Sequence, residues 1–148
     1  MFNIKLCHPD AIIPDKAYDG DAGYDLYACE DIKILPNKRY FVPVGIKTEF
    51  PANYVCLIKD RSSTTKNYFC VAGVIDSGFR GSWLVQIIGR KKYAIKKGEK
   101  IAQFLVLPCW NGKLNIVDEV SDSERGNKKL GSSGKHRRKK YDRQNNTK

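Results

Sequence analysis

Three observations predict a single all-β domain. Stretches rich in β-branched and aromatic residues recur along the chain, each only four to seven residues long, which suits a strand and is too short for a typical helix. Residues with turn chemistry separate these stretches. The chain has 148 residues, a length that suits one compact domain. Together these features favour a β sandwich or barrel.

The expected strands, in chain order, are residues 32–35, 40–44, 54–58, 83–88 and 101–107. Turns are expected between them, for example at Pro36-Asn37, Ser77-Gly78 and Lys97-Gly98. A short helix over 62–66 is left open, because hydroxyl side chains cap helices well whereas β-branched threonines weaken them.

The C-terminal part has a different composition. From Ser121 onward apolar residues almost vanish, which predicts an arm or tail rather than a packed core. The net charge of +11 is uneven, since residues 135–148 hold seven basic residues and one acid. We therefore expect a β domain over 1–120, a mobile glycine-serine arm over 121–134 and a basic, disordered tail over 135–148. Such a charge favours a polyanionic partner: a nucleotide, a nucleic acid or an acidic membrane surface.

Several classes of protein are disfavoured. No apolar run approaches the ~20 residues of a membrane span, and the first ten residues do not resemble an export signal. Five cysteines at irregular spacing fit a reducing compartment, cytoplasmic or nuclear, and most are expected to be buried small hydrophobes rather than zinc ligands. With only His8 and His136, a catalytic triad is disfavoured.

Five polar clusters carry the candidate chemistry. AGYDL at 22–26 leads from a turn into a strand, and by itself favours a solvent-facing Asp25. Residues 59–64 place Arg61 and hydroxyls after a strand, which fits either a phosphate site or a helix cap. In 73–81, Asp76 lies at the tip of a glycine-rich hairpin and is a candidate water activator. Gln103, in 98–103, either faces solvent or is buried with hydrogen-bond partners. The loop 125–134 has the composition of a phosphate cradle without Walker spacing, and a solvated linker is the alternative.

In this order the clusters resemble the motifs of the homotrimeric dUTPase family: AGYDL, RSS at 61–63, GVIDxxFRG at 73–81, GEKIAQ at 98–103 and RGxxxLGSSG at 125–134. The resemblance implies a jelly-roll β fold with a flexible C-terminal arm, a homotrimer with shared active sites, and hydrolysis of dUTP to dUMP and pyrophosphate with Mg²⁺ held by the triphosphate.

The resemblance also implies a role for each matching residue. Asp76 would activate the attacking water, the hairpin backbone would read uracil, and Phe79 would pack against deoxyribose. Asp25 would be linked to the metal through water. The implied substrate-binding set is Arg61, Ser62, Ser63, Gly73, Val74, Ile75, Phe79, Gln103, Arg125, Leu130, Gly131, Ser132 and Ser133.

The sequence departs from the family pattern at Asp60, Ser63 and Thr64, and Leu130 stands where the arm normally carries a Phe that stacks on uracil. One alternative is a dCTP deaminase of the same fold, but Gln86 occupies the position of the deaminase's catalytic Glu and cannot carry a proton. The other is a non-catalytic nucleotide- or nucleic-acid-binding domain that uses the tail. For the tail itself, a solvated extension, nuclear targeting and nucleic-acid attraction stay open.

Overall fold

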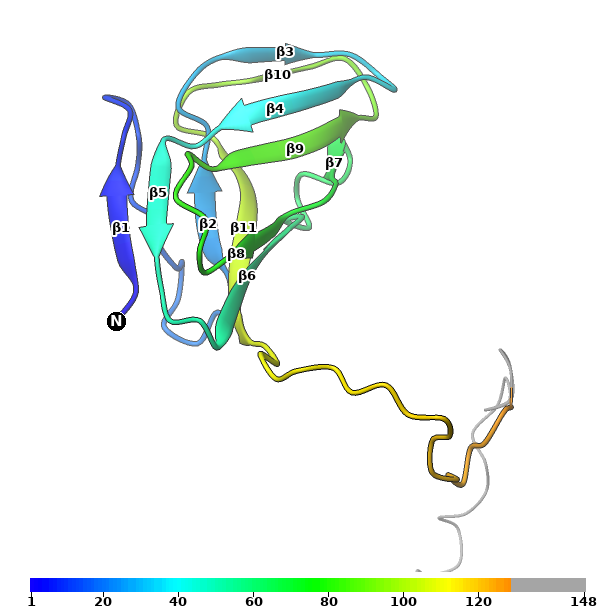
Figure 1. The fold of residues 1–148 in the computed structure, drawn as a ribbon. Helices are drawn as coiled ribbons and strands as arrows, with labels where there is room; N and C mark the ends of the chain where they lie inside the picture. Colours follow the sequence, from blue (N-terminus) through cyan, green and yellow to red (C-terminus); the bar gives the residue numbers. More distant parts are fainter. Residues whose placement is uncertain (129–148) are drawn as a thin grey trace, which may run out of the picture. The chain divides into compact units, whose positions relative to one another are not determined.

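The computed structural model describes residues 1–128, and these form strands and turns without a helix (Figure 1). The all-β prediction is confirmed. No helix in this part of the chain is long and apolar enough to cross a membrane. The strands are β1 (Asn3–Leu6), β2 (Tyr24–Tyr27), β3 (Ile32–Ile34), β4 (Arg39–Pro43), β5 (Ile46–Glu49), β6 (Tyr54–Lys59), β7 (Tyr68–Cys70), β8 (Val74–Asp76), β9 (Leu84–Gly89), β10 (Tyr93–Ile95) and β11 (Lys100–Pro108).

The strands belong to one compact unit, Met1–Gly112; the chain from Lys113 onward forms a second unit. A four-stranded sheet has the order β2-β11-β6-β8, and a three-stranded sheet has the order β4-β9-β7. Two ribbons, β1-β5 and β10-β3, complete the unit, and all these pairings are antiparallel. Figure 1 shows the β10-β3 ribbon beside β4 and β9 at one end of the molecule.

The core lies between the sheets and follows from strand alternation. On β9, Val85 and Ile87 are buried while Leu84 is exposed, as expected when one face of a strand packs inward. The Trp83 ring packs edge-on against Phe104, and its indole N–H donates a 3.1 Å hydrogen bond to Thr48 Oγ1. The buried Trp83 ring therefore has a hydrogen-bond partner for its one polar atom, the indole nitrogen.

The five expected strands are present as β3, β4, β6, β9 and β11, with no end shifted by more than one residue. The possible helix over 62–66 does not form. Thr64 Oγ1 donates to the Arg61 carbonyl at 2.9 Å, and Thr65 Oγ1 donates to the Ser62 carbonyl at 2.8 Å, within consecutive turns. Hydroxyls that bond local carbonyls stabilise turns in competition with a helix.

The cysteines only partly follow expectation. Cys29 and Cys56 are buried, Cys70 and Cys109 are partly exposed, and Cys7 is exposed. All five are free thiols, and burial raises the pKa of Cys56 and of Cys70 to about 12. The expectation that most are buried is therefore wrong, because Cys7 and Cys109 lie at the ends of β1 and β11, outside the core.

Candidate active site

A cavity of about 380 Å³ gathers residues of three sequence clusters at the ends of β2, β11 and β6. Strand register explains the gathering. Asp25 on β2 lies opposite Gln103 on β11, and Gln103 lies opposite Lys59 on β6, so residues far apart in sequence form one row across the sheet. The chain leaves β6 directly into the turn that carries Arg61, Ser62 and Ser63, which also line the cavity.

Asp25 is the centre of this pocket. Its side chain is 10% exposed, and its two oxygens contact Arg61 Nε at 2.8 Å and Lys100 Nζ at 2.7 Å. The hydrogen bond to Asp25 raises the pKa of Lys100 above its ordinary value. A solvent-facing Asp25, the interpretation favoured by that cluster alone, is therefore wrong. Asp25 engages Nε, and Nη1 donates long hydrogen bonds of 3.5 Å to Ser63 Oγ and to the Lys100 carbonyl, so Nη2 is the guanidinium nitrogen left for an anion within residues 1–128.

Gln103 is held inside the pocket rather than pointing to bulk water. Its side-chain N–H donates to the Asp60 carbonyl at 2.8 Å. A Cβ on Gly23 would overlap the Gln103 amide oxygen, so a larger residue there would displace the Gln103 side chain. Asp60, a departure from the family pattern, ties the turn to β7 because its carboxylate accepts a 2.6 Å hydrogen bond from the Cys70 N–H.

Lys100 lies within the 98–103 cluster, but no pattern in the sequence marks it as a site residue. Lys100 could have been found only indirectly from the sequence. A buried carboxylate requires cationic or hydrogen-bonding partners, and Lys100 directly precedes the apolar part of β11. Without knowing that Asp25 is buried, Lys100 looks like any other exposed lysine.

The glycine-rich hairpin borders a second cavity of about 210 Å³. Its walls include Gly73, Val74, Ile75, Phe79 and Gln86. Gly73 has φ +105°, and a Cβ there would lie 2.8 Å from Ile58 Cβ, so no other residue fits this backbone without strain. The hairpin thus exposes backbone at the wall of a hollow.

Asp76 lies apart from the polar pocket. It pairs with Val55 near the start of β6, whereas Gln103 pairs with Lys59 at its end. The offset is about 13 Å along β6 and about 10 Å across two strand spacings, or about 16 Å between the Cα atoms. The Asp76 side chain is exposed. One chain therefore brings Asp25, Arg61, Ser62, Ser63 and Gln103 together but leaves Asp76 outside.

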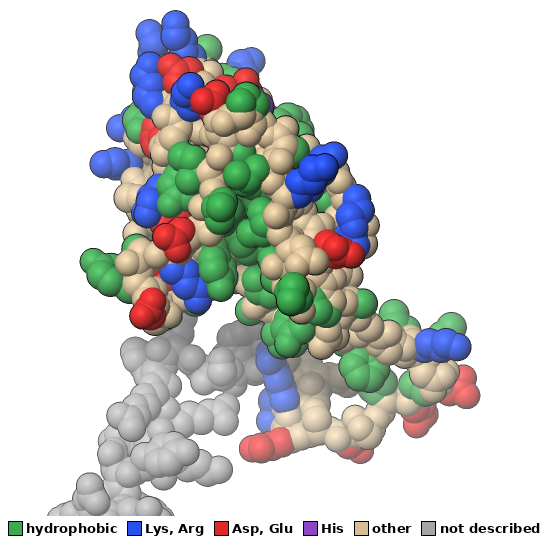
Figure 2. Space-filling view, turned by 90° about the vertical axis from the view of Figure 1, so that its left-hand side faces the viewer, with side chains coloured by type: hydrophobic (Ala, Val, Ile, Leu, Met, Phe, Trp, Pro, Cys, Tyr) green, Lys and Arg blue, Asp and Glu red, His purple; other side chains and the backbone are tan. Residues whose placement is uncertain are grey.

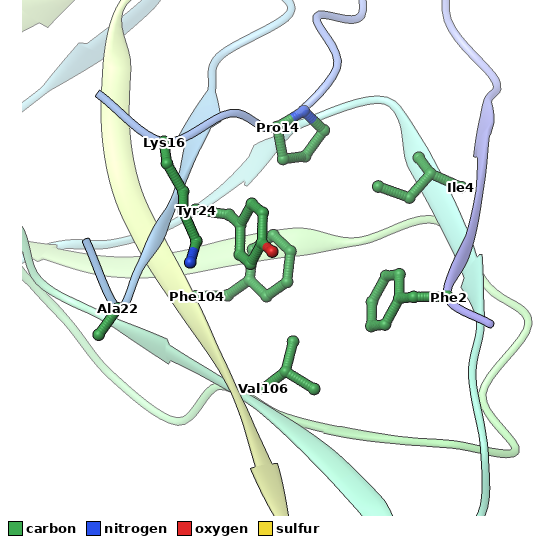
Figure 3. Close-up of a pocket in the computed structure, with 8 residues that line it drawn as sticks. All are labelled: Phe2, Ile4, Pro14, Lys16, Ala22, Tyr24, Phe104 and Val106. Atoms are coloured by element: carbon green, nitrogen blue, oxygen red, sulfur yellow. The ribbon is translucent and has the colours of Figure 1, made fainter. Parts of the chain in front are cut away.

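A larger hollow, of about 440 Å³, lies between β1 and β11 and is mainly apolar (Figure 3). Tyr24 stacks on Phe104 with ring centroids 5.2 Å apart, and Lys16 Nζ lies 4.7 Å from the Tyr24 ring centroid. Figure 2 shows apolar side chains gathered on the face of the molecule that carries β1. Among residues 1–128, Lys16 is the one charged side chain that lines this hollow, so these residues do not suit a triphosphate.

The arm residue Arg125 is exposed in the second unit, where Lys128 N–H donates to its carbonyl at 3.3 Å. Leu130, Gly131, Ser132 and Ser133 lie outside the described residues.

The dUTPase family model matches residues 9–134. This chain belongs to the dUTPase family. It is 36% identical to the deoxyuridine 5'-triphosphate nucleotidohydrolase of Clostridioides difficile, an alignment that covers 90% of this chain and 99% of that protein. A relative of the same name from Clostridium tetani is 39% identical, with 89% and 95% covered. The structure of the Staphylococcus bacteriophage 80alpha dUTPase with dUPNHPP has a TM-score of 0.83 and 28% identity, covering 90% of this chain and 98% of that one.

These findings confirm the predicted dUTPase family, the enzyme class and the jelly-roll β fold. They do not favour a deaminase or a non-catalytic domain.

Proposed function

We propose that this dUTPase hydrolyses dUTP, taken up as its Mg²⁺ complex, to dUMP and pyrophosphate. The observation that carries the proposal is the Arg61–Asp25–Lys100 network in a pocket built from three family motifs. The names of the relatives and the dUPNHPP bound by the phage enzyme support the same substrate.

The polar pocket would hold phosphates. Asp25 fixes Arg61 through Nε, and Nη2 of the guanidinium would donate to a phosphate oxygen. Ser62, Ser63 and Gln103 add polar groups along the wall. Stabilising a triphosphate by fixed charges requires little covalent chemistry from the protein, which fits a site without histidine.

The metal fits this arrangement as part of the substrate. Among residues 1–128 no group of three or more His, Cys, Asp or Glu is placed to hold a metal ion. Mg²⁺ keeps several waters and is commonly bound through substrate phosphates. Asp25 retains lone pairs beyond its two cationic contacts, and one of these would accept a hydrogen bond from a metal-bound water.

The hairpin cavity would hold the nucleoside. Backbone groups at Gly73, Val74 and Ile75 border it and would read the uracil edge, while Phe79 would pack on deoxyribose. Gln86 lines the same cavity and carries no transferable proton, which argues against deamination of a cytosine there.

Asp76 would take a proton from the attacking water as it adds to the α-phosphate. A general base must lie within hydrogen-bond reach of that water, directly or through one further water. The Cα atoms of Asp76 and Gln103 in one chain lie about 16 Å apart, so a water held by Asp76 would lie far from the polar pocket of the same chain. We therefore propose a homotrimer whose sites combine Asp76 of one copy with the polar pocket of another, closed by residues 121–134 with Arg125, Leu130, Gly131, Ser132 and Ser133.

The reaction is tested by incubating purified protein and Mg²⁺ with each deoxynucleoside triphosphate and separating the products. We expect dUMP and pyrophosphate from dUTP, and unchanged dCTP. Deamination of dCTP, or no turnover of any nucleotide, would contradict the proposal.

Site sharing is tested by mixing two inactive variants, Asp76→Asn and Arg61→Ala. The first chain retains Arg61 and the second retains Asp76, so refolded mixed oligomers should regain part of the activity while each variant alone stays inactive. A monomeric mass in light scattering, or no recovery in confirmed mixed oligomers, would exclude shared sites.

A further inference from the structure

Several loops lie at the end of the molecule where β9 finishes and β4 and β10 begin (Figure 1), and together they carry six cations. Backbone hydrogen bonds fix the neighbouring loops together: Asn37 N–H donates to the Gly89 carbonyl at 2.8 Å, and Arg90 N–H donates to the Asn67 carbonyl at 2.8 Å. The loops carry exposed side chains that we call the basic tip: Lys38, Arg39, Lys66, Arg90, Lys91 and Lys92.

The basic tip has no neutralising acids within its own part of the fold. Residues 32–48, 61–75 and 77–98 contain no Asp or Glu, and they include all of β3, β4, β7, β9 and β10. Within residues 1–128, none of the six cations lies within ion-pair distance of a carboxylate. The tip is therefore a fixed concentration of positive charge.

The two ends of β10 provide an internal comparison. Lys91 and Lys92 precede this strand, and a second lysine pair, Lys96 and Lys97, follows it. The second pair is neutralised, because Lys96 contacts Asp31 and Lys97 contacts Asp10, each at 3.0 Å. The two ends of β10 therefore differ, because the lysine pair before the strand is unpaired within residues 1–128 and the pair after it is neutralised.

An exposed aromatic ring adjoins the cations. Phe69 is 42% exposed, and the guanidinium carbon of Arg90 lies 4.7 Å from its ring centroid. Arg90 is also held through Nη1, which donates to the Thr65 carbonyl at 2.8 Å. In the sheet, Phe69 and Arg39 both pair with Ile88, so they lie in one row on the outer face.

We infer that the basic tip binds the phosphate backbone of single-stranded nucleic acid, with Phe69 and the Arg90 plane as a stacking surface for a base. Single-strand binding combines cations that follow the backbone with aromatic rings that stack on bases. An acidic protein could pair with the cations, but it would offer no base to stack on Phe69 and the Arg90 plane. The residues are separate from the polar pocket and the hairpin, so the inference does not depend on the proposed hydrolysis.

The test uses the full chain, a fluorescent oligodeoxyadenylate of about 15 nucleotides, and anisotropy at salt concentrations from about 50 to 200 mM. Saturating dUPNHPP keeps the nucleotide site occupied. Because each lost phosphate contact lowers the salt slope by about 0.7, K91Q/K92Q should reduce that slope by about 1.4 and weaken binding about tenfold near 0.15 M salt. Phe69→Leu should weaken binding with the salt slope unchanged.

The matched control is K96Q/K97Q, which removes the same charge from the other end of β10 and leaves the basic tail intact. We expect its affinity to stay within about twofold of the parent, and all variants to retain dUTP turnover and melting temperature. Equal weakening by the two double variants would assign binding to net charge or the tail and overturn the inference. Loss of binding to phosphatidylserine vesicles by K91Q/K92Q, with oligonucleotide affinity unchanged, would also overturn it.

Discussion

The polar pocket and the glycine-rich hairpin differ in how they are built. In the pocket, side chains hold one another: Asp25 is nearly buried between Arg61 and Lys100, and Gln103 is fixed by the Asp60 carbonyl. In the hairpin, backbone conformation and apolar walls define the hollow, and Asp76 projects from the surface. The chain thus preorganises the charges that would hold a polyanion, and leaves Asp76, the proposed general base, exposed.

Because of this difference, substitutions in the two regions should affect the stability of the fold and the catalytic activity separately. Removing a charge from an interlocked, buried group leaves its partners unsatisfied, which destabilises the fold. Removing an exposed carboxylate costs the fold little, because water already solvates it. Substitutions in the two regions should therefore give opposite combinations of activity and stability.

The largest effect is expected for Asp76→Asn. It should lower kcat at least ~100-fold, because loss of a general base typically costs about 100- to 10,000-fold. KM and the melting temperature should barely move. The control is Glu30→Gln, a change at another exposed acid, which should leave kcat unchanged. A near-parental rate for Asp76→Asn would remove Asp76 from the role of base.

Asp25→Asn should show the opposite balance. An amide cannot satisfy both Arg61 and Lys100, so the free energy of unfolding should fall by about 1–3 kcal/mol, and kcat/KM should fall because Arg61 is no longer fixed. Urea unfolding measures the first change and steady-state kinetics the second. Asp31→Asn is the control, since its lysine partner Lys96 is exposed and the loss should be small. Equal effects of both variants would argue that burial of Asp25 is unimportant.

Gly73→Ala tests whether backbone shape defines the hairpin hollow. The positive φ and the contact with Ile58 should destabilise the protein by about 1–2 kcal/mol and raise KM for dUTP. Gly78→Ala in the same hairpin is the control, because a Cβ there meets no atom within 4 Å and needs no positive φ. If both variants melt and turn over alike, the hollow does not depend on Gly73.

The smallest expected effect is on the thermal stability of the protein at high pH. Because the folded pKa of Lys100 is raised, its pairing with Asp25 stabilises the fold fully below the unfolded lysine value of about 10.4 and is lost as pH rises through the folded pKa. Lys100→Arg keeps its charge and should lose less thermal stability than the parent protein as the pH rises above about 10.4. Tyr68, Cys56 and Cys70 are common to both proteins, so the difference isolates Lys100. An identical decline would show that the pair contributes nothing at high pH.

Local patterns allowed much of the fold to be predicted. Alternating apolar residues and turn chemistry located β3, β4, β6, β9 and β11, because side-chain direction in a strand repeats every two residues. The strands β1, β5, β7 and β10 were missed, since three or four residues carry too little pattern to distinguish them from loop. The hydroxyl-rich turn at 62–66 was ambiguous because the same side chains cap helices and stabilise turns.

The sequence by itself determined the β architecture, the family and the residue types available to the site, since these depend on order and spacing along the chain. Only the tertiary structure decided that Asp25 is buried between Arg61 and Lys100, that Gln103 turns inward, and that Asp76 lies at the other end of β6. The reason is register. Which residues share a row or a face depends on how strands distant in sequence align, and a shift of one residue would turn every side chain of a strand to the opposite face.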